Sequence, residues 1–272
     1  MFSFKERLLS VCPDLPKELI PKGYYRLGNV IILRSRKKWD MFTDKIGNCI
    51  LSLFPWARAV IIQIDTEGVY RRPVSKLIAG NLEIPLIHKE LGTYFVLDPL
   101  KITFSPGNHY ERELLLHEIK NGVVVDMFAC VGNLSMPLSV INNVKVYGVE
   151  ISPYTFDFLV STVKKNQVRT RYVPILGDNR KVTPVNVADY VLMGYFGWDL
   201  SQLRSALRAL RSGKGVVYSH YLVPRGSDVA SIFINAVNSL SAEVIDLEVR
   251  KVKSFSPRKV HYVIIANIQH VS

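Results

Sequence analysis

Polar side chains that could bind a nucleoside stand at the ends of three successive apolar segments in the C-terminal half of the chain. Asp126 ends the first segment, Glu150 ends the second, and Asp178 and Asn179 directly follow the third. The carboxyl ends of parallel strands meet at one edge of a sheet, so these side chains are expected to face a common ligand. A carboxylate at Glu150 can accept hydrogen bonds from both hydroxyls of a ribose, and Asp178 with Asn179 can bind an adenine and its exocyclic amine.

The stretch Asp126-Met-Phe-Ala-Cys-Val-Gly132 follows the first of these segments and leads into a helix. Its small residues let the backbone pass close to a ligand over the strand ends. The three-glycine fingerprint that binds a dinucleotide pyrophosphate is absent from this stretch. A ligand without phosphate fits the single Gly132 better. We therefore expect S-adenosylmethionine as the co-substrate, with Asp126 and Gly132 in its binding site.

The elements that must position these residues alternate regularly from about Val123 onward. Apolar runs alternate with segments of helical periodicity, which is typical of a doubly wound parallel sheet. The predicted strands are Val123–Asp126, Lys145–Glu150, Tyr172–Leu176, Ala188–Met193 and Gly215–Tyr221, and the predicted helices are Leu134–Val140, Pro153–Asn166, Leu200–Arg211 and Val229–Leu240. Two further runs, Ala242–Lys253 and Lys259–Ile268, predict a C-terminal antiparallel hairpin. The fold class is therefore α/β, a Rossmann-like sheet of the class I methyltransferase type.

The first 97 residues follow a different pattern, which predicts a small α+β domain before the sheet. Strands are expected at Tyr25–Leu33 and Ala59–Asp65, around an amphipathic helix at Trp39–Leu53. Further strands are expected on either side of Asp98-Pro99, at Thr93–Leu97 and Lys101–Phe104. We therefore predict two domains, residues 1–97 with a possible tRNA contact and residues 98–272 with the co-substrate site.

The amino-acid composition indicates which kinds of partner and which cellular compartment to expect for this protein. The net charge of +12 is distributed over both halves, which favours a folded surface that meets a polyanion. No apolar run is long enough for a membrane span, so no membrane association is expected. The three cysteines, Cys12, Cys49 and Cys130, lack metal-ligand spacing. They predict a cytoplasmic protein without disulfides and without a bound metal.

Four motifs in one order resemble a family of tRNA-modifying enzymes. They are Phe104-Ser-Pro-Gly-Asn-His-Tyr-Glu-Arg112, Asp126–Gly132, Gly177-Asp-Asn-Arg180, and Val252-Lys-Ser-Phe-Ser-Pro257 followed by His261. The family comprises the tRNA guanine N1-methyltransferases that act next to the anticodon and the related aminocarboxypropyl transferases of wybutosine synthesis. The resemblance implies co-substrate contacts from Ser105 and Arg112 in addition to Glu150, Asp178 and Asn179. Arg112 offers a planar fork for the carboxylate of the co-substrate, and Ser105 a hydroxyl donor.

The segment after the fourth predicted strand distinguishes two reactions. In the methylating branch this segment is Asn-Leu-Pro, whereas this chain has Met193-Gly-Tyr-Phe-Gly197. This segment resembles the aminocarboxypropyl branch, and so does Gly107-Asn108 in the first motif. The resemblance implies transfer of the 3-amino-3-carboxypropyl group to C7 of 4-demethylwyosine in tRNA(Phe), with methylthioadenosine as the leaving product. Two alternatives remain open: a tRNA guanine N1-methyltransferase with the same co-substrate, and a non-catalytic RNA-binding module.

The sequence indicates the residues of proton transfer and of RNA binding less specifically than it indicates the co-substrate site. His109 and Tyr195 could assist the chemistry, but no general base is assigned. Tyr195, Phe196 and Trp198 could stack on an unstacked base of the anticodon region. The basic groups that could hold phosphates are Arg34–Lys38, Arg71-Arg72 and Arg169–Arg171.

Overall fold

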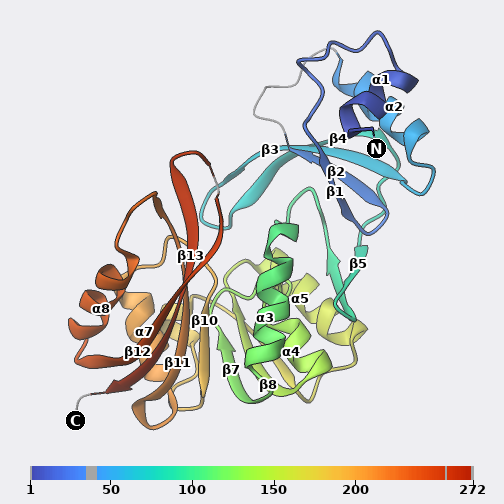
Figure 1. Ribbon diagram of the computed structural model, residues 1–272. Coiled ribbons are helices and arrows are strands. Elements are labelled where there is room, and N and C mark those ends of the chain that lie inside the picture. Colours follow the sequence, from blue (N-terminus) through green and yellow to red (C-terminus); the bar gives the residue numbers. More distant parts are fainter. Residues whose placement is uncertain (1, 35–41, 255, 271–272) are drawn as a thin grey trace. The chain divides into compact units, whose positions relative to one another are not determined.

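The computed structural model describes residues 2–34, 42–254 and 256–270, which form two compact units (Figure 1). The N-terminal unit contains Met1–Lys89 and Val96–Pro106, and the C-terminal unit contains Glu90–Phe95 and Gly107–Ser272. The units therefore interleave along the chain between residues 89 and 107. The domain boundary at residue 97 stays a prediction.

A four-stranded sheet forms the centre of the N-terminal unit. Its strands lie in the order β1-β2-β3-β4, with β2 and β3 parallel and the other two pairs antiparallel. The elements are α1 (Phe4–Val11), β1 (Tyr24–Leu27), β2 (Val30–Arg34), α2 (Thr43–Leu53), β3 (Ala59–Glu67) and β4 (Arg72–Gly80). Helix α2 is thus the crossover between the parallel strands β2 and β3, as parallel pairing requires.

The strand predicted over Tyr25–Leu33 is wrong as a single strand. The chain reverses at Gly28 and Asn29, so that Leu27 pairs with Val30 in an antiparallel hairpin. Gly28 has φ 59°, and a Cβ atom there would lie 2.5 Å from the carbonyl oxygen of Ile87. A glycine is therefore required at this turn both by the backbone conformation and by the close neighbour.

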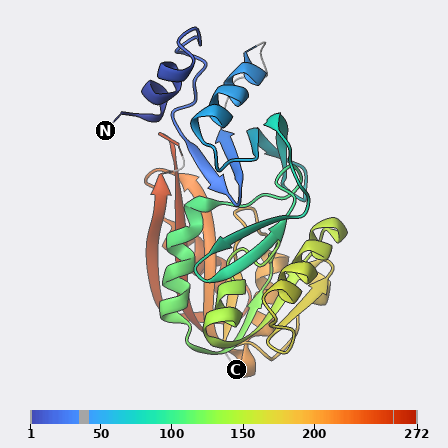
Figure 2. The same cartoon turned by 90° about the vertical axis from the view of Figure 1, so that its right-hand side faces the viewer.

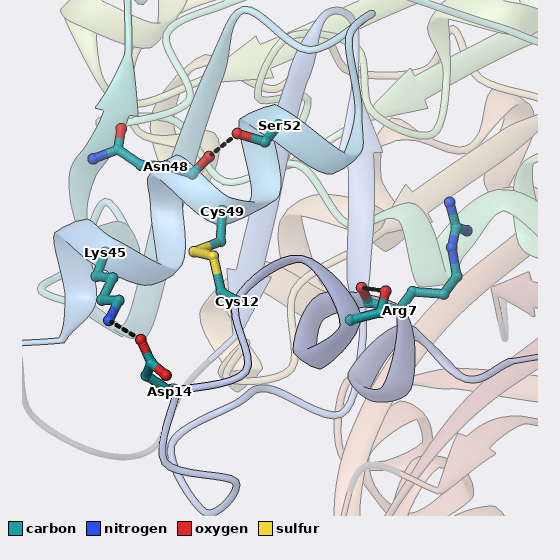
Figure 3. The surroundings of a disulfide bond; sticks show 8 residues. Arg7, Cys12, Asp14, Lys45, Asn48, Cys49 and Ser52 are labelled. Carbon is teal, nitrogen blue, oxygen red and sulfur yellow. Dashed lines mark hydrogen bonds and ion pairs between the residues drawn. A yellow bond between two sulfur atoms is a disulfide. The ribbon is translucent and has the colours of Figure 1, made fainter.

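A disulfide bond joins Cys12, just after α1, to Cys49 in α2 (Figure 3). Its sulfur atoms are 1.91 Å apart. The expectation of a protein without disulfides is therefore wrong, since sequence spacing alone does not show that packing brings these two cysteines together. The bond lies beside the apolar core of this unit, in which Leu8 and Ile50 are fully buried.

Strands β5 (Leu86–Glu90) and β6 (Thr93–Leu97) form a separate two-stranded ladder. The strand predicted at Lys101–Phe104 is wrong, because this segment follows a tight turn. The buried Asp98 carboxylate accepts the N–H of Leu100 at 2.9 Å, and the Asp98 carbonyl accepts the N–H of Ile102 at 2.8 Å. An aspartate that binds its own downstream backbone in this way favours a turn over an extended strand.

The C-terminal unit has a seven-stranded sheet in the order β12-β13-β11-β10-β7-β8-β9 (Figure 1). Strands β7 to β11 are parallel, and β13 lies antiparallel between β11 and β12, which confirms the predicted α/β fold with a terminal hairpin. The strands are β7 (Asn121–Asp126), β8 (Asn143–Glu150), β9 (Tyr172–Leu176), β10 (Tyr190–Met193), β11 (Lys214–Pro224), β12 (Ala242–Ser254) and β13 (Lys259–His270).

Helices cover both faces of this sheet. In Figures 1 and 2, α3, α4 and α5 lie over one face, while α7 and α8 lie over the other. The helical elements are η1 (Pro106–Asn108), α3 (His109–Glu118), α4 (Met136–Ile141), α5 (Pro153–Lys165), α6 (Asn179–Val182), α7 (Leu200–Ala209), η2 (Arg211–Gly213) and α8 (Val229–Asn238). Leu203 and Phe233 bring α7 and α8 onto sheet residues such as Val191 and Ile264. None of the helices in the described part of the chain combines the length and apolarity that crossing a membrane would need.

Candidate co-substrate site

The predicted strand-end residues of the C-terminal unit lie along one edge of its parallel sheet. Strands β7 and β8 are paired up to Asp126 and Gly148, and β8 and β9 up to Glu150 and Leu176. The sheet register therefore brings the ends of β7, β8 and β9 next to one another. This is the edge at which doubly wound sheets bind their ligands.

Glu150 is held by backbone donors on both of its oxygens. Oε2 accepts the N–H of Cys130 at 2.9 Å, and Oε1 accepts the N–H of Ser152 at 2.8 Å. Burial raises the pKa of the Glu150 carboxyl, and these two hydrogen bonds oppose that shift. Each carboxylate oxygen can accept two hydrogen bonds, so each keeps a lone pair for a ribose hydroxyl. The acceptor sites that remain on the Glu150 carboxylate therefore fit the ribose hydroxyls of the expected co-substrate.

Asp126 is almost completely buried, at 1% exposure. Its Oδ1 accepts the N–H of Phe128 at 3.1 Å. Burial is the main cause that raises the pKa of Asp126 to about 6, with hydrogen bonds from Ser135 and Phe128 acting in the opposite direction. The structure thus places this carboxyl at the base of the loop that follows β7, where it fixes the start of the turn.

The loop from Met127 to Gly132 takes an unusual backbone path. Cys130 has φ 53° and Gly132 has φ 86°, in the left-handed region that glycine adopts at little cost. The Ala129 N–H donates to the Val149 carbonyl at 2.9 Å, so the loop lies against the end of β8. Gly132 is therefore needed for the shape of the loop, and its contact with a co-substrate stays a prediction.

Asp178 and Asn179 begin helix α6 and already have partners within the protein. Arg180 donates to the Asp178 carboxylate at 2.6 Å, and this interaction lowers the pKa of Asp178. Asn179 is buried, with its amide nitrogen 2.9 Å from the Met127 carbonyl and its side-chain oxygen 3.1 Å from Gln202 Nε2. Asn179 thus ties α6 to the end of β7, while the more accessible Asp178 carboxylate remains the predicted adenine contact.

Arg112 lies inside the C-terminal unit, with a side chain that is 0% exposed. Its Nε donates to Glu90 at 2.6 Å, and its Nη1 donates to the Asn133 carbonyl at 3.3 Å. The half-exposed His109 also approaches Glu90, with its Nδ1 3.1 Å from the carboxylate. The sequence did not indicate Glu90 as a partner, because nothing in the pattern links a residue before the first motif to Arg112. A contact between Arg112 and the co-substrate carboxylate stays a prediction.

Ser105 belongs to the other compact unit. It precedes η1 in the segment Val96–Pro106 of the N-terminal unit, whereas the other six predicted site residues belong to the C-terminal unit. Its predicted role as a hydroxyl donor to the co-substrate stays a prediction.

The segment that follows β10 lies against aromatic neighbours from several elements. Tyr195 packs on Phe128 of the loop after β7, with ring centroids 5.3 Å apart, and Trp198 packs edge-on against Tyr221 at the same distance. All three aromatic side chains of the segment, Tyr195, Phe196 and Trp198, are partly buried. The loop after β10 therefore borders the loop after β7, and stacking of its aromatic side chains on an RNA base stays a prediction.

The basic groups predicted to hold phosphates are distributed over both units. Arg71 and Arg72 are exposed in the N-terminal unit, where Arg72 lies over the ring of Tyr70. Arg169 is exposed in the C-terminal unit. Residues 35–38 of the group Arg34–Lys38 lie outside the described residues. RNA contacts at these positions stay predictions.

Comparison with known proteins decides the family. Residues 86–250 match the TRM5/TYW2 methyltransferase domain, and residues 4–83 match the TYW2 N-terminal domain. The chain belongs to the TRM5/TYW2 family. A relative from Pyrococcus horikoshii, the tRNA(Phe) (4-demethylwyosine(37)-C(7)) aminocarboxypropyltransferase, is 31% identical over 258 residues, which cover 92% of each chain.

Solved structures of both branches of the TRM5/TYW2 family have this fold. P. horikoshii TYW2 in complex with MeSAdo is 28% identical, with a TM-score of 0.83 over 98% of this chain and 100% of that one. The complex of aTrm5 and tRNALeu is 27% identical, with a TM-score of 0.82 over 99% of this chain and 78% of that one. These structures confirm the Rossmann-like sheet preceded by an N-terminal domain.

Proposed function

We propose that this chain transfers the 3-amino-3-carboxypropyl group of S-adenosylmethionine to C7 of 4-demethylwyosine in tRNA(Phe). The observation that carries the proposal is Met193-Gly-Tyr-Phe-Gly197, which replaces the asparagine and proline of the methylating branch at the end of β10. The relative named for this reaction supports it across nearly the whole chain. MeSAdo, bound in the P. horikoshii structure, is the part of S-adenosylmethionine that remains after this transfer.

The protein contributes binding and orientation to this reaction. In this proposal Glu150 holds the ribose, and the loop after β10 holds the acceptor base. The acceptor carbon C7 forms a bond to the γ carbon of the amino-acid arm while the bond between that carbon and sulfur breaks, with its electron pair staying on sulfur. C7 then releases its proton and the ring becomes aromatic again. Choosing the γ carbon over the methyl carbon is a matter of which one faces the base.

Analysis of the reaction products tests the proposed transfer. The protein is incubated with tRNA that carries 4-demethylwyosine and with S-adenosylmethionine labelled on either the methyl or the carboxyl carbon. We expect the carboxyl label in the tRNA, the methyl label in methylthioadenosine, and at most traces of S-adenosylhomocysteine. S-adenosylhomocysteine as the main product, formed in step with tRNA modification, would establish a methyltransferase instead. Absence of both labels from the tRNA and of both products would support a non-catalytic RNA-binding module.

A substitution at Glu150 tests the co-substrate site. Glu150→Ala removes the acceptor of two ribose hydrogen bonds, and charge-assisted bonds of this kind contribute about 2–3 kcal/mol together. We expect calorimetry to show S-adenosylmethionine affinity lowered by roughly 30- to 150-fold in a folded variant. The matched control is Asp157→Ala, which removes the same charge from an exposed position on α5. Equal affinities for both variants would remove Glu150 from the site.

The partner and the compartment follow from the same proposal. The substrate is tRNA, bound through its anticodon region, with the net charge of +12 favouring contact with phosphates. We place the reaction in the cytoplasm, because the tRNA substrate is there. The Cys12–Cys49 bond is compatible with this placement, since cytoplasmic proteins of some thermophilic organisms contain disulfides.

A further inference from the structure

Two buried histidines on neighbouring strands are not used by the proposed reaction. His220 lies on β11 and His261 on β13, with exposures of 3% and 0%. His220 Nδ1 and His261 Nε2 are 2.9 Å apart, within hydrogen-bonding distance. His261 is the last residue of the fourth sequence motif, for which neither the co-substrate site nor the acceptor loop (residues 194–198, after β10) provides a role. The pair is therefore a buried polar contact between neighbouring strands that the proposed transfer does not use.

The pair lies where β10 ends and the acceptor loop begins. Met193, the last residue of β10, pairs with Ser219 of β11, so His220 is the next residue beyond that pairing. Strands β10, β11 and β13 lie side by side in Figure 1. The ring of Phe196, in the acceptor loop, packs edge-on against His261 with centroids 4.8 Å apart and planes at 73°. His261 is thus in direct contact with the loop that distinguishes the two branches of the family.

The first and fourth motifs meet at the same place. Lys253 of β12 is opposite His261 in the strand register, and its Nζ lies 3.3 Å from the side-chain oxygen of Asn108. A Cβ atom at Gly107 would lie 2.5 Å from that Nζ, so a larger residue there would displace the lysine. Gly107 and Asn108 are the two residues that resemble the aminocarboxypropyl branch in the first motif. Residues that distinguish the branches therefore lie on both sides of His261.

Chemistry and burial favour a structural hydrogen bond between the two rings. Burial is the main cause that lowers the pKa of His220 to about 4, with Lys253 and Arg250 adding to the shift. Burial likewise lowers the pKa of His261, so both rings are neutral near pH 7. One neutral ring then donates to the other, which fixes the orientation of both. The second ring nitrogen of His261 has no hydrogen-bond partner within the described residues, so the bond to His220 is the polar contact that orients it.

We propose that His220 and His261 are positioning residues, in which the hydrogen bond between the two rings orients His261 and His261 orients Phe196 for the acceptor base. This proposal rests on the proposed transfer to tRNA. In this proposal His261, the histidine of the fourth motif, helps to hold the acceptor base and does not contact the co-substrate. Displacement of a reacting group by about 1 Å can cost a factor of 100 in rate, so loop position matters for the transfer.

The test compares two substitutions at His220, the hydrogen-bond partner of His261. His220→Asn keeps a hydrogen-bonding group near the position of Nδ1, whereas His220→Leu removes it and leaves His261 Nε2 unpaired. We expect His220→Leu to lower the rate of transfer at saturating substrates by roughly 10- to 100-fold. We expect it to leave S-adenosylmethionine affinity within about twofold, and His220→Asn to retain most of the rate. Val217→Ala, a buried change elsewhere on β11, is the control for loss of stability alone.

Two further measurements separate positioning from a general structural role. Amide hydrogen exchange of residues 194–198 should be faster in His220→Leu and unchanged in His220→Asn and Val217→Ala. In a Phe196→Leu background, His220→Leu should cause little additional loss of rate, because the two residues act in series. Wild-type exchange in His220→Leu, or an equal loss of rate in both His220 variants, would overturn the proposal. If wild-type protein transfers no label to tRNA, the proposed function fails, and the exchange measurement still decides the role of the pair.

Discussion

Removal of the Cys12–Cys49 disulfide is expected to lower the free energy of unfolding by about 4 kcal/mol. The two cysteines are 37 residues apart in sequence, and a bond that closes a loop of this length restricts the unfolded chain strongly. The bond connects the end of α1 to α2, beside the core of the N-terminal unit (Figure 3). Chemical denaturation of the Cys12→Ser, Cys49→Ser double variant against wild-type protein without reductant measures this difference.

Reductant provides the control for this comparison. It should destabilise wild-type protein by the same amount and leave the double variant unaffected. Thiol titration of the denatured protein should give one thiol before reduction, from Cys130, and three after it. Three thiols in unreduced wild-type protein would contradict the bond.

Asp126→Asn is expected to raise the free energy of unfolding by about 3 kcal/mol at pH 8. The pKa of Asp126 is raised from 3.8 to about 6 by burial. The native state therefore binds more protons than the unfolded state between these two values. The wild-type protein loses stability as the pH rises from about 4 to about 6, and the loss is complete above that range. The asparagine carries no charge, so it avoids this loss.

The pH dependence distinguishes this effect from a change in packing. The advantage of Asp126→Asn should decline below pH 6 and vanish below about pH 3, where the wild-type carboxyl is protonated in both the native and the unfolded state. The exposed Asp157→Asn serves as control and should change stability little at any pH. A stability difference for Asp126→Asn that is independent of pH would show that the buried charge is not its cause.

The fold of the C-terminal unit could be predicted because its elements follow from local patterns. Alternating apolar runs and helical segments place β7 to β11 in a parallel sheet, and Tyr172–Leu176 was predicted with the observed ends. Parallel pairing then brings Asp126, Glu150 and Asn179 to one edge without further information. The same reasoning missed α1 and β4 (Arg72–Gly80), since neither has a strong apolar period of its own.

Contacts between residues far apart in sequence could not be predicted in this way. His220 and His261 are 41 residues apart, and their pairing depends on β13 inserting between β11 and β12. Cys12 and Cys49 meet only because α1 packs beside α2. Local patterns give the elements, whereas such pairs depend on how the elements pack.

The short stretch Glu90–Phe95 has a consequence for how this protein can be divided or recombined. It belongs to the C-terminal unit although segments of the N-terminal unit flank it on both sides. Glu90 neutralises the buried Arg112, and the backbone of Tyr94 exchanges two hydrogen bonds with the Asn166 side chain at the end of α5. Exchange of modules at any single point between residues 95 and 112, the predicted boundary at residue 97 included, would separate Arg112 from its own Glu90. Because the two units interleave along the chain, they can be exchanged between related proteins only together.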